Sequence, residues 1–146
     1  MLGRLHLAAE SDEQRAAAIP DPPADNGAGR VVSTELSAQK VITAAQNLAD
    51  AGLDAVVEIR EGDARETLVT ITEPLGLLLL DGWKELYLPV LKLLEPWLLP
   101  GALALADDSS FGSLQPCITY VRDPRNGYET VAFPVEDGVE ISCRTA

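Results

Sequence analysis

The stretch LLLLDGWKELYLPVLKLLEP, Leu77 to Pro96, joins an aliphatic run to a carboxylate and a lysine. The segment LGLLLL (75–80) has no charged position, which is typical of a parallel strand that is covered on both faces. The segment YLPVLKLLEPWL (87–98) then predicts a helix, because Pro89 fits its first turn. Asp81 and Lys84 therefore follow the end of a buried strand, which is either a plain strand terminus or part of an active site.

Strands and helices alternate on both sides of this stretch. Further strands are predicted at 30–36, 55–62 and 101–107, and further helices at 37–52, 64–72 and 114–121. Ser37 is available as the N-cap of the first of these helices and Gly52 as its C-terminal stop. This alternation predicts an α/β fold with a mostly parallel sheet.

The two ends of the chain differ from this pattern. Segments 128–135 and 138–144 alternate in polarity around a short acidic turn that ends in Gly138, which predicts a C-terminal antiparallel hairpin at the sheet edge. The Ala-rich segment 2–19 predicts a helix, and IPDPPADNGAG (19–29) predicts a turn or linker. We expect residues 1–28 to form this helix and linker and residues 29–146 to form the main domain.

Composition restricts the partners and the location. A length of 146 residues is typical of one domain, and a net charge of −12 argues against nucleic acid and anionic membrane surfaces as partners. Charged residues and prolines interrupt every apolar run, so we expect no membrane span, no secretory signal and a cytoplasmic protein. Cys117 and Cys143 lack metal-site spacing and are expected as reduced thiols.

Carboxylates follow four successive predicted strands. Their positions are Glu35, Asp63, Asp81 and the pair Asp107 and Asp108. Ligands of open α/β sheets bind beyond the carboxyl ends of the strands, so these side chains would meet at one edge. The structural alternative is that each acid caps the helix that follows it.

Each of these positions also has a chemical use. Glu35, at the end of the second strand of a Rossmann-like unit, could accept hydrogen bonds from both ribose hydroxyls of an adenosine. The oxygen donors of Asp81, Asp107 and Asp108 suit Mg²⁺. Lys84, close to such a metal, could have a lowered pKa and act as a general base toward a hydroxyl group.

Four motifs occur in the order found in a known family: Glu35 with NLADAGL, then EIREGDA, LLLLDGWK and ALADD. From about Gly29 to the C-terminus the chain resembles the class I S-adenosylmethionine-dependent methyltransferases, in particular the metal-dependent catechol O-methyltransferase-like branch. The resemblance implies a Rossmann-like methyltransferase sheet and transfer of a methyl group from S-adenosylmethionine to a small-molecule, catechol-type hydroxyl.

The resemblance also assigns roles to individual residues. It implies that Glu35 binds the ribose, that Asp63 and Ala64 contact the adenine edge, and that Trp83 packs near the cofactor. Asp81 would serve both the cofactor and a divalent metal, which Asp107 and Asp108 would complete. Lys84 would be the base that activates the acceptor hydroxyl.

The sequence departs from the family in two places. Asp108 stands where the catechol enzymes usually have Asn, which adds a negative charge to the expected metal site. The first strand and its glycine-rich loop, roughly E-x-G-x-G, are expected to be missing, since Gly27 and Gly29 follow no predicted strand. The sheet centre would then be gapped or rearranged, or paired by another chain, and we expect a homodimer or oligomer that covers it.

Two other functions are compatible with the sequence. The chain could be a non-catalytic, truncated relative of the methyltransferases that acts as an oligomeric or binding module. An unrelated flavodoxin-like or receiver-type domain is disfavoured, because a receiver needs paired acids at the end of its first strand. His6, Tyr87, Trp97 and Tyr128 are interpreted as surface or packing residues, and Arg122 and Arg125 as solvated.

Overall fold

The aliphatic run forms the strand β4 (Leu75–Leu80), and the helix α3 (Tyr87–Leu94) follows it, as predicted. The computed structural model describes residues 16–20 and 29–145. The other strands are β1 (Ala16–Pro20), β2 (Val31–Glu35), β3 (Val57–Glu61), β5 (Leu98–Asp107), β6 (Tyr128–Phe133) and β7 (Val139–Arg144). The other α-helices are α1 (Ala38–Asp50), α2 (Ala64–Thr67) and α4 (Gln115–Arg122), and the short 3₁₀ turn η1 (Lys84–Leu86) precedes α3.

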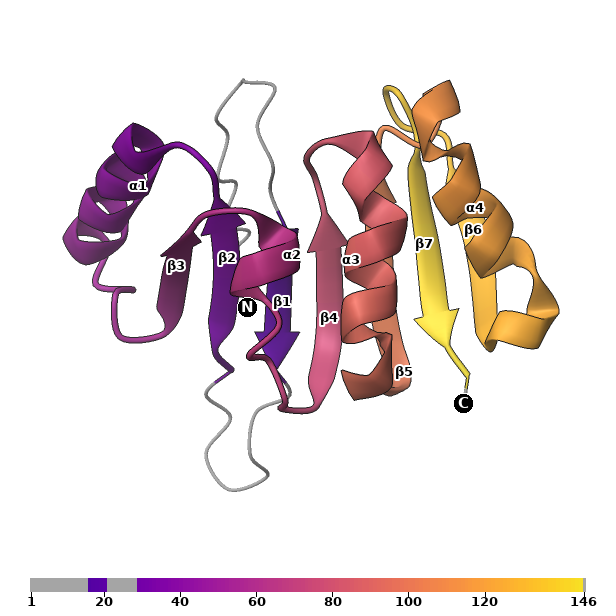
Figure 1. Cartoon of the computed structure of the whole chain (residues 1–146), viewed down its shortest axis with the longest axis horizontal. Helices are drawn as coiled ribbons and strands as arrows, with labels where there is room; N and C mark the ends of the chain where they lie inside the picture. The colour runs from indigo at the N-terminus through magenta and orange to yellow at the C-terminus, as the bar shows by residue number, and fades with distance from the viewer. Residues whose placement is uncertain (1–15, 21–28, 146) are drawn as a thin grey trace.

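The seven strands of the described ranges form one sheet in the order β3-β2-β1-β4-β5-β7-β6. β2 is parallel to β3, and β4 is parallel to β5. β7 is antiparallel to both β5 and β6, which makes β6 and β7 the C-terminal hairpin (Figure 1). The prediction of an α/β fold whose strands are mostly parallel, with a C-terminal antiparallel hairpin, is confirmed.

The centre of the sheet differs from the expectation. Residues 16–19 belong to a strand rather than a helix, and β1 lies between β2 and β4, antiparallel to both (Figure 1). The chain itself thus fills the position expected to lack a strand, and the sheet is rearranged rather than gapped. The open sheet centre was the reason for expecting an oligomer, and that reason no longer holds.

The reversed direction of β1 determines where the chain leaves it. Pro20, the last residue of β1, pairs with Leu75, the first residue of β4. Gly29 and Arg30 precede β2 at the same amino edge, where the Arg30 guanidinium lies 3.2 Å from Glu73 Oε1. A parallel first strand would instead lead into a loop at the carboxyl edge. Gly27 lies outside the described residues.

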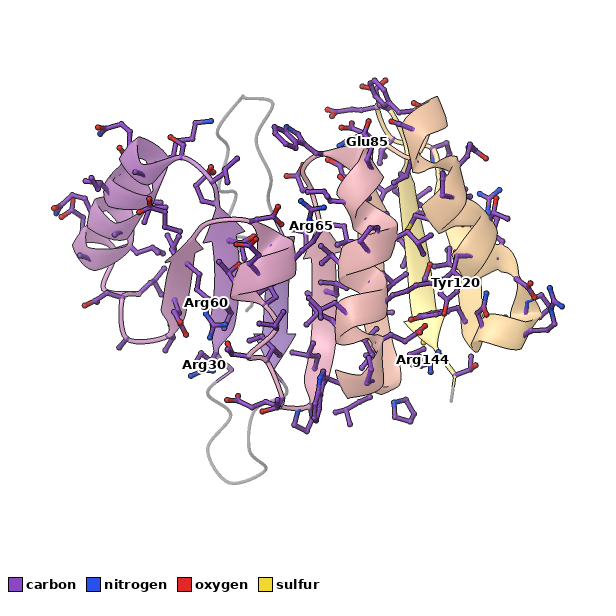
Figure 2. All side chains as sticks on the ribbon, in the orientation of Figure 1. Arg30, Arg60, Arg65, Glu85, Tyr120 and Arg144 are labelled. Carbon is purple, nitrogen blue, oxygen red and sulfur yellow. The ribbon has the colours of Figure 1, made fainter. Side chains whose placement is uncertain are left out.

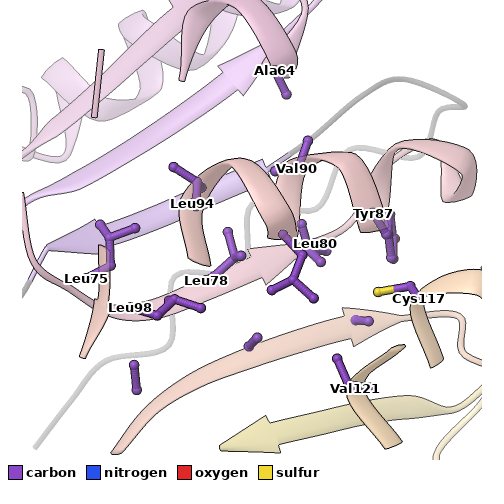
Figure 3. Packing of buried hydrophobic residues seen from close by; sticks show 14 of the residues in the cluster. Ala64, Leu75, Leu78, Leu80, Tyr87, Val90, Leu94, Leu98, Cys117 and Val121 are labelled. Carbon is purple, nitrogen blue, oxygen red and sulfur yellow. The ribbon is translucent and has the colours of Figure 1, made fainter. Parts of the chain in front are cut away.

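The hydrophobic core lies between the sheet and the helices α2, α3 and α4 (Figure 1). Figure 3 shows Leu78 and Leu80 of β4 facing Val90 and Leu94 of α3, with Cys117 and Val121 of α4 nearby. Leu78 and Leu94 are 0 % exposed. Leu78 and Leu80, two positions apart, therefore form the side of β4 that the helices cover.

The other face of the same strands is open. Leu79, between Leu78 and Leu80, is 38 % exposed, and Leu103 on β5 is 39 % exposed. The expectation that β4 is covered on both faces is therefore wrong for the described part of the molecule.

Smaller predictions can be compared with the structure directly. Ser37 caps α1, since its hydroxyl accepts a hydrogen bond from the Lys40 N–H, and Gly52 ends the helix with φ of 68°. Arg122 is not simply solvated, because its guanidinium makes two 2.8 Å hydrogen bonds to the buried carboxylate of Glu140. None of the helices in the described ranges is long and apolar enough to cross a membrane.

Candidate functional site

The site residues predicted from the sequence gather at one edge of the sheet. β1 is antiparallel to both β2 and β4, so β2 and β4 are parallel to each other and share their direction with β3 and β5. The carboxyl ends of these four strands therefore lie at one edge, which we call the carboxyl rim. Figure 2 shows Glu85, the neighbour of Lys84, at this upper edge and Arg30 and Arg144 at the lower one.

Lys84 is the centre of the polar contacts at the carboxyl rim. Its Nζ lies 2.7 Å from Asp108 Oδ2 and donates a 2.9 Å hydrogen bond to the Tyr87 hydroxyl. The same hydroxyl accepts a 3.0 Å hydrogen bond from the Gly82 N–H. The Lys84 ammonium group and the Tyr87 hydroxyl therefore join the end of β4, the turn η1 and the end of β5.

These contacts fix the protonation state of Lys84. Burial lowers the pKa of the amine, but the hydrogen bonds to Asp108 and Tyr87 outweigh burial, and the net shift is upward. With only these residues of the chain around it, Lys84 is therefore an ammonium ion at neutral pH. This direction is opposite to the lowered pKa expected for a general base.

Asp107 and Asp81 complete the charged groups of this part of the rim. Burial raises the pKa of Asp107, and the neighbouring carboxylates of Asp108 and Asp81 raise it further, against a backbone hydrogen bond and Lys84, which lower it. Asp107 therefore lies within electrostatic range of Asp81, Asp108 and Lys84. Even so, the described residues contain no group of three His, Cys, Asp or Glu side chains arranged to hold a metal ion.

The loop that carries Asp108 is attached to the C-terminal hairpin. Asp108 has a left-handed backbone with φ of 56°, which is uncommon for a residue other than glycine. The next two residues, Ser109 and Ser110, donate backbone hydrogen bonds of 2.9 Å to the carbonyl groups of Gly138 and Asp137. The β6–β7 turn thus supports the position of the carboxylate that binds Lys84.

The cofactor part of the predicted site begins at Glu35. This residue ends β2, is 5 % exposed, and its Oε1 accepts a 2.9 Å hydrogen bond from the Ser37 N–H. A buried carboxylate at a strand end is the chemistry that binds paired ribose hydroxyls.

Other predicted cofactor residues have local structural roles as well. Asp63 caps α2 and binds the Arg65 guanidinium at 2.6 Å, so the capping alternative holds for this acid. The Ala64 side chain is buried in the core. Trp83, which follows Asp81 and Gly82, is 45 % exposed at the rim.

Tyr87 is the site residue that sequence reasoning missed. Its ring is only 2 % exposed, so the interpretation as a packing residue is correct for the ring. Its hydroxyl, however, contacts both Lys84 and Gly82. The spacing of three residues from Lys84, one helical turn, was the signal that could have found it.

The arrangement of this sheet and its carboxyl rim defines the class of protein. Solved methyltransferase structures share this fold, a central α/β sheet that ends in a β6–β7 hairpin. Residues 16–109 match a family described as a methyltransferase domain, and the chain belongs to this family.

Individual relatives agree with this assignment. Catechol O-methyltransferase B of Danio rerio is 31 % identical over 127 residues, which cover 77 % of this chain and 48 % of that protein. The O-methyltransferase of Bacillus cereus in complex with SAH has a TM-score of 0.70 at 20 % identity, covering 80 % of this chain and 63 % of that one. The SAH-bound methyltransferase of Podospora anserina has a TM-score of 0.69 at 20 % identity, covering 79 % and 60 %.

The chain spans about half the length of the Danio rerio protein and less than two thirds of these two structures. The fold and the family are therefore shared, whereas activity, substrate and partners belong to the proposals below.

Proposed function

We propose that this protein binds S-adenosylmethionine and transfers its methyl group to a small-molecule hydroxyl of the catechol type. The observation that carries the proposal is the ammonium group of Lys84, held by Asp108 and Tyr87 beside the carboxylates of Asp81 and Asp107. The named relative, catechol O-methyltransferase B, and the SAH complexes of the fold neighbours support it.

The cofactor would lie between Glu35 and the end of β4. Glu35 would accept the ribose hydroxyls, Asp63 and Ala64 would border the adenine, and Asp81 and Trp83 would line the other side. The buried, hydrogen-bonded carboxylate of Glu35 fits this task. The direction of β1 does not provide a glycine-rich loop for the methionine end, because the chain leaves this strand at the opposite edge of the sheet.

Lys84 would act on the acceptor oxygen. As an ammonium ion it donates hydrogen bonds and favours the ionised form of a hydroxyl beside it, which makes the oxygen a better nucleophile. To act as the base itself, Lys84 would first have to release a proton, and its contacts with Asp108 and Tyr87 oppose that release. Electrostatic stabilisation of the oxyanion is therefore the role that the geometry supports best.

Magnesium remains a proposal based on the family resemblance and on donor chemistry. Asp81, Asp107 and Asp108 offer the oxygen ligands that Mg²⁺ prefers, yet the described residues do not form a ready ligand group, and Asp108 already binds Lys84. The residues as arranged do not fit a preformed metal site, so no chemical step is assigned to a metal. If Mg²⁺ competes with the Lys84 ammonium group for Asp108, the change Lys84→Met should increase Mg²⁺ affinity in a calorimetric titration.

A second candidate function is that of a non-catalytic relative that acts as a binding module. The reversed β1 favours it, because this strand runs away from the carboxyl rim and so does not lead into a loop at the cofactor's methionine end, as a parallel first strand would. Binding of cofactor without methyl transfer would support this candidate.

A methyl-transfer assay tests the proposal. Purified protein is incubated with S-adenosylmethionine carrying a labelled methyl group, Mg²⁺ and a catechol, and label in the catechol is counted. We expect turnover that falls about 100-fold or more in Lys84→Met. Lys92→Met is the matched control, since Lys92 lies on α3 over the Tyr120 ring. Absence of transfer by the unchanged protein, or full activity of Lys84→Met, would contradict the proposal.

A further inference from the structure

One face of the sheet presents aligned apolar side chains that no described element covers. Residues opposite each other on neighbouring strands share a face, so the strand register gives the rows. Leu79, Leu105, Ile141 and Val131 are successive partners across β4, β5, β7 and β6. They form an unbroken apolar row.

Rows on either side extend this surface. Leu77, Leu103 and Cys143 form the row toward the amino edge, and Val139 and Phe133 form the row toward the carboxyl rim. We call these three rows the open face. Phe133 is 52 % exposed and Val131 is 57 % exposed, in contrast to the core positions on the opposite face.

Charge is nearly absent from the open face. Its rows end in Glu129 at the outer strand and Asp107 at the rim, and no basic residue belongs to them. The whole chain carries a net charge of −12, so its acids are concentrated elsewhere. A partner surface that matches the open face must therefore be apolar rather than basic.

The width of the open face indicates what could cover it. Four strands spaced about 4.8 Å apart are roughly 19 Å wide, and three rows bring the flat area to roughly 400 Å². A single helix, about 10 Å in diameter, would cover two of the four strands. A second sheet would cover all four at once, as in packed β-sheets.

We propose that the open face is a dimer interface that packs against the same face of a second copy. A two-fold axis near Leu105 and Ile141 would place apolar rows against their equivalents and leave Glu129 and Asp107 at the margin. Two faces of this size bury on the order of 800 Å² in projection, which is below the roughly 1,200 Å² of stable specific interfaces and predicts a weak, concentration-dependent dimer. An isologous contact of this kind needs no second surface.

Sedimentation velocity over a range of protein concentrations tests this inference. We expect a monomer at low concentration and a dimer at high concentration. Added salt should favour the dimer, because it screens the repulsion between two copies of net charge −12 while the apolar contact remains. A monomer at every concentration, or a dimer that salt dissociates, would overturn the proposal.

Two variants distinguish a specific interface on the open face from the general effect of exposed apolar residues. Leu103→Lys, in the open face, should weaken dimerisation about tenfold or more. Ile42→Lys is the matched control, because Ile42 is an exposed apolar residue of α1 outside that face. Unchanged dimerisation of a folded Leu103→Lys protein would contradict the inference.

A measurement on the unchanged protein tests the same inference without requiring that a variant folds. Cys143 lies in the open face, whereas Cys117 is in the core. Alkylation of Cys143 should slow as the protein concentration rises into the range where the dimer forms. Equal alkylation rates at all protein concentrations would overturn the proposal. Complete protection of Cys143 in the monomer would also overturn it, because the same chain would then cover the open face.

Discussion

The two faces of β4 and β5 are both largely apolar but have different surroundings. On one face Leu78, Leu80 and Ala104 are buried under α3 and α4. On the other face Leu79 and Leu103 are each more than a third exposed. The difference shows that an apolar strand indicates a tendency to be covered on both faces but does not say which element covers each one.

The largest expected contrast between the faces is in thiol reactivity. Cys117 lies in the core below α4, where burial raises the pKa of its thiol to about 12, while Cys143 lies half-buried on the open face. In dilute solution at pH 8 we expect an alkylating reagent to modify Cys143 at least about 100-fold faster than Cys117, since the thiolate is the reactive form. Mass spectrometry of the peptides gives both rates. Similar rates would show that the core around Cys117 opens readily.

Truncation of neighbouring leucines should separate the faces by stability. Leu78→Ala removes a side chain that is 0 % exposed, and we expect a loss of about 3 kcal/mol in the free energy of unfolding. Leu79→Ala, the next residue on the open face, should cost under about 1 kcal/mol in the monomer. Denaturant titrations at a protein concentration below dimer formation measure both. Equal losses would mean that the open face is covered in solution.

A smaller loss of stability is expected when the charged pair on the covered face is broken. Arg122 is half-exposed, but Glu140 is 1 % exposed, so Arg122→Ala leaves a buried carboxylate without its cation. After allowance for solvent screening we expect a loss of about 1–2 kcal/mol at pH 7. Arg125→Ala, which breaks an exposed pair with Asp123, is the control and should cause no measurable change.

The loss of stability caused by Arg122→Ala should also depend on pH. The hydrogen bonds from Arg122 lower the pKa of Glu140 below its usual value, against burial, which raises it. A lowered pKa contributes stability above the usual carboxyl pKa, and that contribution is lost as the pH falls through the lowered value. The difference between Arg122→Ala and the unchanged protein should therefore shrink in acid. A difference that is constant from pH 7 to pH 3 would show that packing, not charge, is responsible.

Local patterns predicted most of the fold. The Ser37 cap, the Gly52 stop and the hairpin turn that ends in Gly138 depend on neighbouring residues alone, and the structure has each of them. The alternation of predicted strands and helices also placed acids after four of the strands. β1 did not, because Ala16–Pro20 is short, rich in alanine and defined only by its pairing with β2 and β4.

The candidate site shows the same limit. Asp81, Lys84, Asp107 and Asp108 could be placed at one edge from strand order, but the contact of Lys84 with Asp108 could not. That contact sets the protonation state of the lysine, and it depends on side-chain geometry between two strand ends. The Tyr87 hydroxyl is different, because its spacing of three residues from Lys84 was a local signal that could have predicted the contact.

Binding of S-adenosylmethionine is the measurement that tests the account most directly. Isothermal titration calorimetry of the full chain should show one site with a dissociation constant below about 1 mM. Glu35→Gln, which keeps an oxygen for the Ser37 N–H but removes the carboxylate charge, should weaken binding about tenfold or more. Absence of binding at millimolar cofactor, or identical binding by Glu35→Gln, would contradict the proposed cofactor site at the carboxyl rim.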